Sequence, residues 1–185
     1  MKTINGKIYI FSAGGCGTRI FYDWVKKYYN RINNQSRVHH DIPPKKLGVN
    51  DRVIYLFGTP EDSILSFYKK DADAGKFIKE HCQNLKIPFV NLNIDDYIEK
   101  GDDLFGLRFH FNKYNSLNNI MLVNYNYLWE NLDVICDYLN LSEVKSTFPT
   151  KKERRDIKIQ HDKKGLSAIY VDFNKIIDKI KIIKK

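Results

Sequence analysis

Short apolar runs alternate along the chain with longer segments in which apolar residues recur every three or four positions. The runs KIYIFS (7–12), RVIYLFG (52–58), PFVNL (88–92) and NIMLVNY (119–125) are nearly unbroken and rich in β-branched and aromatic residues. Such runs are typical of strands that are buried on both faces. Strands alternating with helices predict an α/β domain, a three-layer α/β/α arrangement around a mostly parallel central sheet.

Helical periodicity predicts four helices between and after these strands. The first starts at Gly17 or Thr18, and the second begins after Pro60, a residue that suits the first turn of a helix. The third covers 127–139, and the last is a C-terminal helix within 170–184. A charged stretch with seven basic residues, TKKERRDIKIQHDKKG (150–165), is expected to be a loop.

Composition limits the class of protein. The chain has 185 residues, of which 43% are hydrophobic and 14% aromatic, so a single folded domain over 1–185 is expected. Three cysteines, Cys16, Cys82 and Cys136, lie far apart, and neither a disulfide framework nor a metal-ligand spacing is expected. No apolar run approaches the roughly 20 residues that span a bilayer, and no segment has a signal-peptide pattern. The expectation is a cytoplasmic protein without a membrane span.

The net charge of +9, from 31 Lys and Arg against 22 Asp and Glu, favours anionic partners. The segment FSAGGCGTRI (11–20) is the first place where an anion would bind. A strand that turns through glycines into a helix directs backbone N–H groups and the positive helix end at one point. The loop differs from a Walker A sequence, which has a lysine where Gly17 stands. The predicted binding residues are Gly14, Gly15, Cys16, Gly17, Thr18 and Arg19.

Two families share this local pattern. The string AGGCGTR resembles the signature of sugar nucleotidyltransferases and, less literally, the first phosphate loop of sulfotransferases. The segment DRVIYLFGTPEDSILSFYKK (51–70) favours the second family, because it resembles the second cofactor motif of sulfotransferases. That motif is a strand ending in Arg, a turn with Pro and Asp, and a helix with a Ser eight positions after the Arg.

The sulfotransferase resemblance implies a P-loop NTPase-like fold and a donor, 3′-phosphoadenosine 5′-phosphosulfate, that needs no metal. Ser66 matches the serine that holds the 3′-phosphate, whereas Gly58 stands at the arginine position and Gly15 at the lysine position of the first loop. Tyr125-Asn126-Tyr127-Leu128 stands where the family has Tyr-Glu-Asp-Leu. Further along, Lys163, Lys164 and Gly165 are similar to the family's C-terminal Arg-Lys-Gly loop.

Sulfuryl transfer also needs a base, and in the family this is a histidine shortly before the second motif. His40, and after it His39, stand in that location, and a neutral imidazole suits the role. His110 lies among apolar residues and is expected to be structural, while His81 and His161 have no context that suggests a role. The expected partners are the nucleotide cosubstrate and an acceptor hydroxyl or amine. Cations that would replace the missing lysine and arginine are Arg19, Lys151, Arg154, Arg155, Lys163 and Lys164.

Three alternatives remain. A degenerate protein of the same fold would bind a nucleotide phosphate without transferring a group, because Gly15 and Gly58 lack the family's charges. A nucleotidyltransferase-like enzyme would need a divalent metal and a triphosphate. A nucleic-acid-binding module would use the basic segment, but no nucleic-acid motif is present and nucleic acid is not expected as a partner. The acceptor stays open among carbohydrates, small molecules and proteins.

Overall fold

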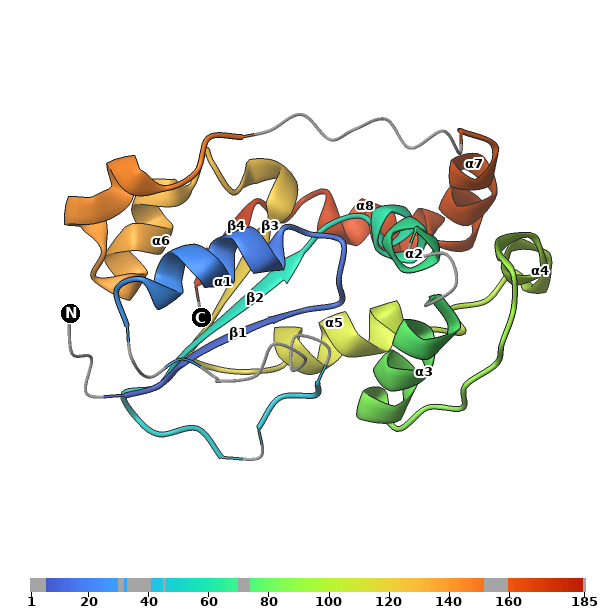
Figure 1. The fold of residues 1–185 in the computed structure, drawn as a ribbon, viewed down its shortest axis with the longest axis horizontal. Helices are drawn as coiled ribbons and strands as arrows, with labels where there is room; N and C mark the ends of the chain where they lie inside the picture. Colours follow the sequence, from blue (N-terminus) through green and yellow to red (C-terminus); the bar gives the residue numbers. More distant parts are fainter. Residues whose placement is uncertain are drawn as a thin grey trace.

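The computed structural model describes residues 6–29, 32, 41–44, 46–69, 74–151 and 160–184. Strands, helices and 3₁₀ turns alternate along the chain (Figure 1). In chain order the elements are β1 (Ile8–Ser12), α1 (Thr18–Lys26), β2 (Arg52–Phe57), α2 (Pro60–Tyr68), α3 (Ala74–Leu85), α4 (Ile94–Lys100), α5 (Leu107–Asn115), β3 (Ile120–Asn124), η3 (Tyr125–Tyr127), α6 (Leu132–Leu139), η4 (Ser142–Thr147), α7 (Gln160–Ile169), α8 (Val171–Ile177) and β4 (Ile182–Lys184).

The sheet has the order β1-β2-β3-β4. The strands β1, β2 and β3 pair in parallel, with Ile10 opposite Ile54 and Ile54 opposite Met121, whereas β4 pairs antiparallel with β3. On the other edge of β1, Ile32 forms an isolated parallel bridge with Ile8. The prediction of an α/β protein with a mostly parallel sheet is therefore confirmed.

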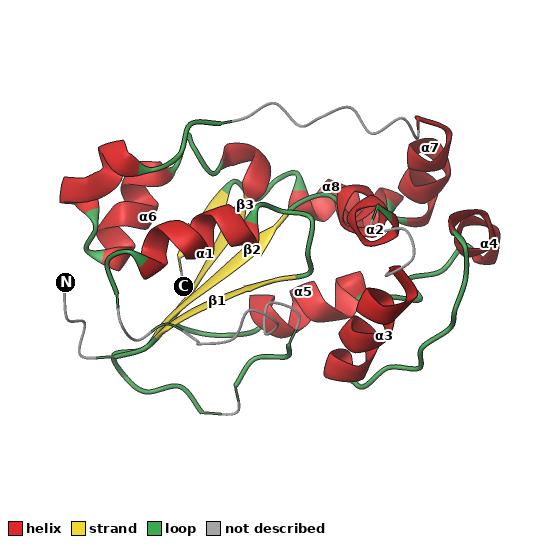
Figure 2. Ribbon diagram, viewed as in Figure 1, coloured by secondary structure: helices red, strands yellow, loops and turns green. Residues whose placement is uncertain are grey.

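Apolar side chains fill both faces of the sheet, because successive residues of a strand point to opposite sides. Phe11, Tyr55 and Phe57 face one cluster, together with residues of α2, α3, α5, α7 and α8. Ile10 and Ile54 face the other, with residues of α1 and α6. Figure 2 shows α1 and α6 on one side of the strands and α5 on the other. Among the described residues, no helix has both the length and the apolar character needed to cross a membrane.

Three element predictions were wrong. Residues 88–92 form no strand; they connect α3 to α4, with Pro88 and Val90 exposed, and Pro88 has no N–H to donate to a ladder. The C-terminal helix ends at Ile177, and Ile182–Lys184 forms β4 instead. The basic segment is not a loop throughout, since α7 begins at Gln160.

Candidate functional site

The carboxyl ends of β1, β2 and β3 meet at one edge of the sheet. Ser12 stands opposite Leu56, and Phe57 stands opposite Asn124, so the segments that follow these strands are neighbours. In open α/β sheets, ligands bind outside this edge. The glycine loop (13–17), the first turn of α2 and the start of η3 form the candidate site.

The glycine loop turns β1 into α1 through backbone conformations that favour glycine. Gly14, Gly15 and Gly17 have φ values of 100°, 68° and 68° and are each half-buried. Gly17 is the N-cap of α1 and has no side chain to accept a hydrogen bond from the first-turn amides of that helix. These amides and the positive end of α1 suit an anion.

Short polar side chains hold the loop in place. The Thr18 hydroxyl donates to Ser12 Oγ at 2.6 Å, and the amide of Gly14 donates to the same oxygen at 3.2 Å. The buried Cys16 thiol donates to the carbonyl of Leu56 at 3.3 Å. Because the proton of Thr18 is directed at Ser12, the loop presents backbone amides, rather than this hydroxyl proton, to a ligand.

The loop packs directly against α2. The Ser63 hydroxyl donates to the carbonyl of Gly14 at 2.9 Å. A Cβ atom at Gly15 would lie 2.8 Å from the carbonyl oxygen of Asp62 and 2.9 Å from Cα of Ser63. Real Cβ atoms do not approach backbone this closely, so position 15 has no room for a side chain.

An aromatic side chain borders the start of α1. A Cβ atom at Gly17 would lie 2.1 Å from Cε2 of Tyr125, so the tyrosine ring covers one side of the N-cap. Trp129 meets that ring edge-on, with 5.3 Å between ring centroids. Tyr125 is half-buried and shapes the wall of the candidate site beside the loop amides.

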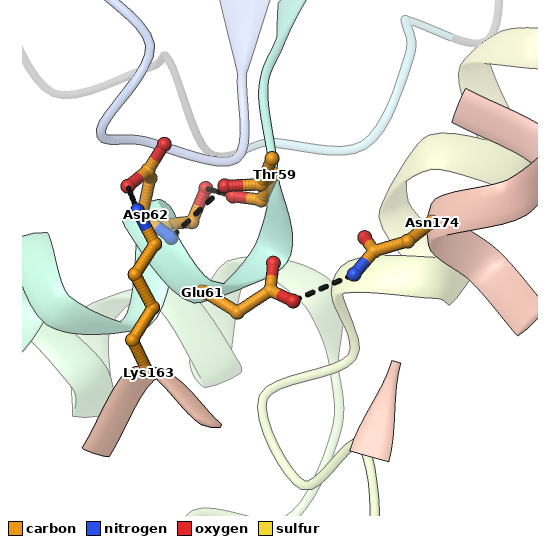
Figure 3. A network of polar contacts seen from close by, with 6 residues as sticks. Thr59, Glu61, Asp62, Lys163 and Asn174 are labelled. Carbon is orange, nitrogen blue, oxygen red and sulfur yellow. Dashed lines mark hydrogen bonds and ion pairs between the residues drawn. The ribbon is translucent and has the colours of Figure 1, made fainter. Parts of the chain in front are cut away.

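The first turn of α2 is acidic, and its side chains connect α2 to α7 and α8 (Figure 3). Thr59 caps it by accepting a hydrogen bond from the amide of Asp62 at 3.3 Å. Lys163 of α7 donates to Asp62 Oδ1 at 3.3 Å, and Asn174 of α8 donates to Glu61 Oε1 at 2.6 Å. The turn therefore places two carboxylates shortly after Gly58, the position at which the sulfotransferase resemblance has an arginine.

The structure brings together only part of the predicted binding set. Gly58 directly follows β2, and the half-buried Ser66 lies one turn beyond Asp62 on α2, on the face that contacts the loop. Arg19 points to solvent, with a side chain 94% exposed and 3.9 Å from Asp23. Lys164 is exposed on α7.

Gly165 lies inside the helix α7 rather than in a loop. A Cβ atom there would lie 2.7 Å from Ile98 of α4, so this glycine allows α7 and α4 to pack closely. Lys151 has its ammonium 5.8 Å from the centre of the Trp129 ring. His39 and His40, the predicted bases, and the cations Arg154 and Arg155 lie outside the described residues.

A small cavity of about 20 Å³ lies beside the loop, enclosed mainly by apolar residues of β2, α2, α5 and α8. Ala13, Gly58, Pro60 and Ser63 line it on the side of the candidate site. A cavity needs about 10–15 Å³ for one water molecule, so this one is too small for part of a nucleotide. Among the described residues, no group of three or more His, Cys, Asp or Glu side chains is placed to hold a metal ion.

Two histidines, on α3 and α5, are buried side by side. His81 and His110 are 1% and 0% exposed, with ring centroids 6.0 Å apart. Nε2 of His110 lies 2.9 Å from the carbonyl of Asp41, which can only accept, so this nitrogen carries the proton and Nδ1 accepts from the Tyr55 hydroxyl at 3.0 Å. Burial lowers the pKa of His81 to about 4; burial and the neighbouring His81 lower the pKa of His110 to about 3.

The expectation that His110 is structural agrees with its burial and its two hydrogen bonds. Sequence reasoning missed Glu61 and Asn174. The one available signal was an acidic residue in the first turn of a predicted helix, and that signal usually indicates a solvated helix end.

Comparison of the chain with protein-family models and with curated protein sequences returned no match. The class of protein is therefore described from its fold and its glycine loop. The chain is an α/β protein with an open, mostly parallel four-stranded sheet and a glycine loop at its carboxyl edge.

Proposed function

We propose that this protein binds 3′-phosphoadenosine 5′-phosphosulfate through its glycine loop and transfers the sulfuryl group to an acceptor hydroxyl or amine. The finer fold assignment, a P-loop NTPase-like sulfotransferase fold, is part of the same proposal. One observation supports it best. The two segments that resemble the sulfotransferase cofactor motifs, at 11–20 and 51–70, lie side by side at the carboxyl edge of the sheet, where Ser63 contacts Gly14.

The proposed chemistry is a direct in-line transfer. The acceptor oxygen or nitrogen forms a bond to sulfur while the bond from sulfur to the phosphate oxygen breaks, and 3′,5′-adenosine bisphosphate leaves. A base, assigned to His40 or His39 by the sequence resemblance alone, takes the acceptor proton. The amides of the glycine loop stabilise negative charge on the leaving phosphate.

A second candidate function is binding of a nucleotide phosphate without transfer. The closed contact of Gly15 with α2 favours it, because the bridging lysine of the family cannot stand at that position. The glycine at position 58 favours it too, because it supplies no charge to a phosphate where the resemblance has an arginine.

Calorimetric titration with 3′,5′-adenosine bisphosphate tests the binding step. We expect metal-independent binding, with a stability gain of roughly 2.7 kcal/mol at 100 times the dissociation constant. Ser66→Ala is expected to weaken binding about tenfold or more, since a hydrogen bond to a charged group contributes about 1.5–3 kcal/mol. Ser116→Ala, an exposed position after α5 and far from the carboxyl edge, is the matched control.

Three outcomes separate the functions. Binding of the bisphosphate together with sulfuryl transfer to an acceptor supports the sulfotransferase. Binding without transfer in an acceptor screen supports the degenerate protein. A magnesium-dependent response to a nucleoside triphosphate, without a response to the bisphosphate, would contradict both and favour the nucleotidyltransferase.

Lys163 is a predicted cation that forms an ion pair with Asp62, in the turn of α2 that packs against the glycine loop. A lysine ammonium has three donors, so an anion at the loop can share it with Asp62. Lys163→Gln is expected to change stability by less than about 1 kcal/mol, because the lysine side chain is 56% exposed. The same change should weaken bisphosphate binding several-fold, and more at low than at high salt. Equal affinity of Lys163→Gln and Lys164→Gln, the exposed neighbour, would exclude this role.

A further inference from the structure

The connection between α3 and α4 is an extended segment with a strand-like sequence and no partner strand. The chain runs from Ile87 to Asn93 without a turn or bend, and Figure 2 shows it at the outer margin of the molecule. Its side chains alternate as in a strand: Ile87 and Phe89 pack against the core, whereas Pro88 and Val90 are exposed. The segment therefore has one apolar face toward the core and a second apolar face toward the outside.

The backbone of this segment offers hydrogen-bonding groups along one side. The carbonyl of Leu92 accepts a hydrogen bond from the Tyr68 hydroxyl at 2.9 Å, so this carbonyl is directed toward α2. Backbone groups of successive residues in an extended chain point to opposite sides, so those of Phe89 and Asn91 point away from α2. In the described part of the chain, no group is hydrogen-bonded to the N–H or C=O of either residue. A free strand edge of this kind is a template for another strand.

The positions of the occupied groups determine how a second strand can pair. In an antiparallel ladder, residue pairs that are hydrogen-bonded alternate with pairs that are not. If Phe89 and Asn91 belong to the hydrogen-bonded pairs, Pro88 and Leu92 fall at the other positions. Pro88 lacks an N–H, and the Leu92 carbonyl is already bonded to Tyr68, so this arrangement needs neither of them. The opposite arrangement would need both.

The same segment of a second copy of the chain satisfies this pattern. With Val90 of one copy opposite Val90 of the other, Phe89 of each copy stands opposite Asn91 of the second copy, and each such pair exchanges two N–H···O bonds. The two exposed valine side chains meet at the central pair, which has no hydrogen bonds and therefore the closest side chains. Such a twofold contact is self-complementary.

Charge favours the antiparallel orientation of the two copies. Lys86 stands directly before the segment and Asp95 shortly after it, and both are exposed. Antiparallel pairing brings the Lys86 end of one copy to the Asp95 end of the other, so opposite charges meet at both ends of the ladder. Parallel pairing would bring like charges together.

We propose that residues 87–93 dock against the same residues of a second copy of this chain, as an antiparallel ladder centred on Val90. The contact is small, so we expect weak association, with a dissociation constant of roughly 0.1–1 mM. The docking surface does not depend on the proposed function, and its test uses no nucleotide.

Sedimentation equilibrium from roughly 20 µM to 1 mM protein tests the association. We expect the average mass to rise with concentration. Val90→Lys places two ammonium groups opposite each other, so it should raise the dissociation constant by about tenfold or more. It should not change the urea midpoint of unfolding, because the position is exposed. Val134→Lys is the matched control, since this valine of α6 and Val90 are both 44% exposed, and it should associate like the unaltered protein.

Charge reversal tests the orientation of the two copies. Lys86→Glu and Asp95→Lys should each weaken the association about two- to fivefold at low salt. The double variant should restore it, because opposite charges meet again at both ends of the ladder. A double variant that associates more weakly than either single variant would overturn the antiparallel arrangement.

Two results would overturn the proposal as a whole. One is a constant monomer mass up to the highest concentration, which would mean that the segment does not pair with its own copy. The other is equal association of Val90→Lys and Val134→Lys, which would place the contact on another surface.

Discussion

The free energy of unfolding is expected to fall by about 4 kcal/mol when the pH is lowered from 7 to 5. The cause is the pair of buried histidines, His81 and His110, whose pKa values are lowered to about 4 and about 3. In the unfolded chain a histidine titrates near 6.5. Below that pH the unfolded chain binds protons that the folded protein excludes.

The direction follows from proton linkage. Since the pKa of each histidine is lower in the folded state, the stabilisation is fully present above pH 6.5 and is lost progressively as the pH falls from that value toward the pKa of the folded state. Each histidine contributes about 1.4 kcal/mol per pH unit, or about 2 kcal/mol by pH 5. Burial raises the pKa of Asp41 and Asp103, and this opposes the trend only where those carboxyls titrate.

Urea unfolding at pH 7, 6 and 5 measures the pH dependence of the free energy of unfolding. Single substitutions show how much of this dependence each histidine causes. His81→Gln and His110→Gln should each remove about half of the pH dependence, whatever their stability at pH 7. The double variant should be nearly independent of pH over this range. A double variant with the same pH dependence as the unaltered protein would mean that other groups take up the protons.

The sequence predicted the parts of the fold that depend on the pattern of neighbouring residues. Three apolar runs became β1, β2 and β3, because each fits only a strand buried on both faces. The isoleucines near the C-terminus fit both a helical and a strand period, and the available edge of β3 decided in favour of β4. The run at 88–92 had a strand composition but no partner strand in the sheet.

In the candidate site, too, only the features that depend on neighbouring residues could be predicted. Gly14, Gly15 and Gly17 could be predicted as a turn, since only their backbone conformations are needed. The contact between Glu61 and Asn174 joins residues 113 positions apart, and no local pattern indicates it. The side-by-side placement of His81 on α3 and His110 on α5 is equally a result of helix packing, so the pH dependence had no signal in the sequence.

Restoring a lysine at position 15 is expected to destabilise the protein by about 2–5 kcal/mol, and not to improve ligand binding. The sulfotransferase resemblance alone suggests that Gly15→Lys would restore a missing charge. In the structure, any side chain at this position requires a positive φ, at about 1–2 kcal/mol, and places Cβ 2.8 Å from the backbone of α2. Overpacking of this kind costs about 1–3 kcal/mol, and backbone cannot turn aside as a flexible side chain can.

Gly101 provides a matched control for the energetic cost of a side chain at a positive φ. It has the same φ of 68° as Gly15, at the end of α4, and an added Cβ would meet nothing within 4 Å. Gly101→Ala should therefore show the cost of the positive φ alone, and Gly15→Ala and Gly15→Lys should both exceed it by the cost of the clash. Urea unfolding of the three variants measures these differences.

Calorimetric titration then measures the affinity of the Gly15 variants for 3′,5′-adenosine bisphosphate. If Gly15→Lys is less stable than Gly101→Ala and binds the bisphosphate more weakly than the unaltered protein, the loop works in the position seen against α2, and its cation comes from elsewhere, as we propose for Lys163. If Gly15→Lys is as stable as Gly101→Ala and binds the bisphosphate more tightly, the loop separates from α2 when the ligand binds. In that case the contact between Gly15 and α2 would no longer favour the protein without transfer activity.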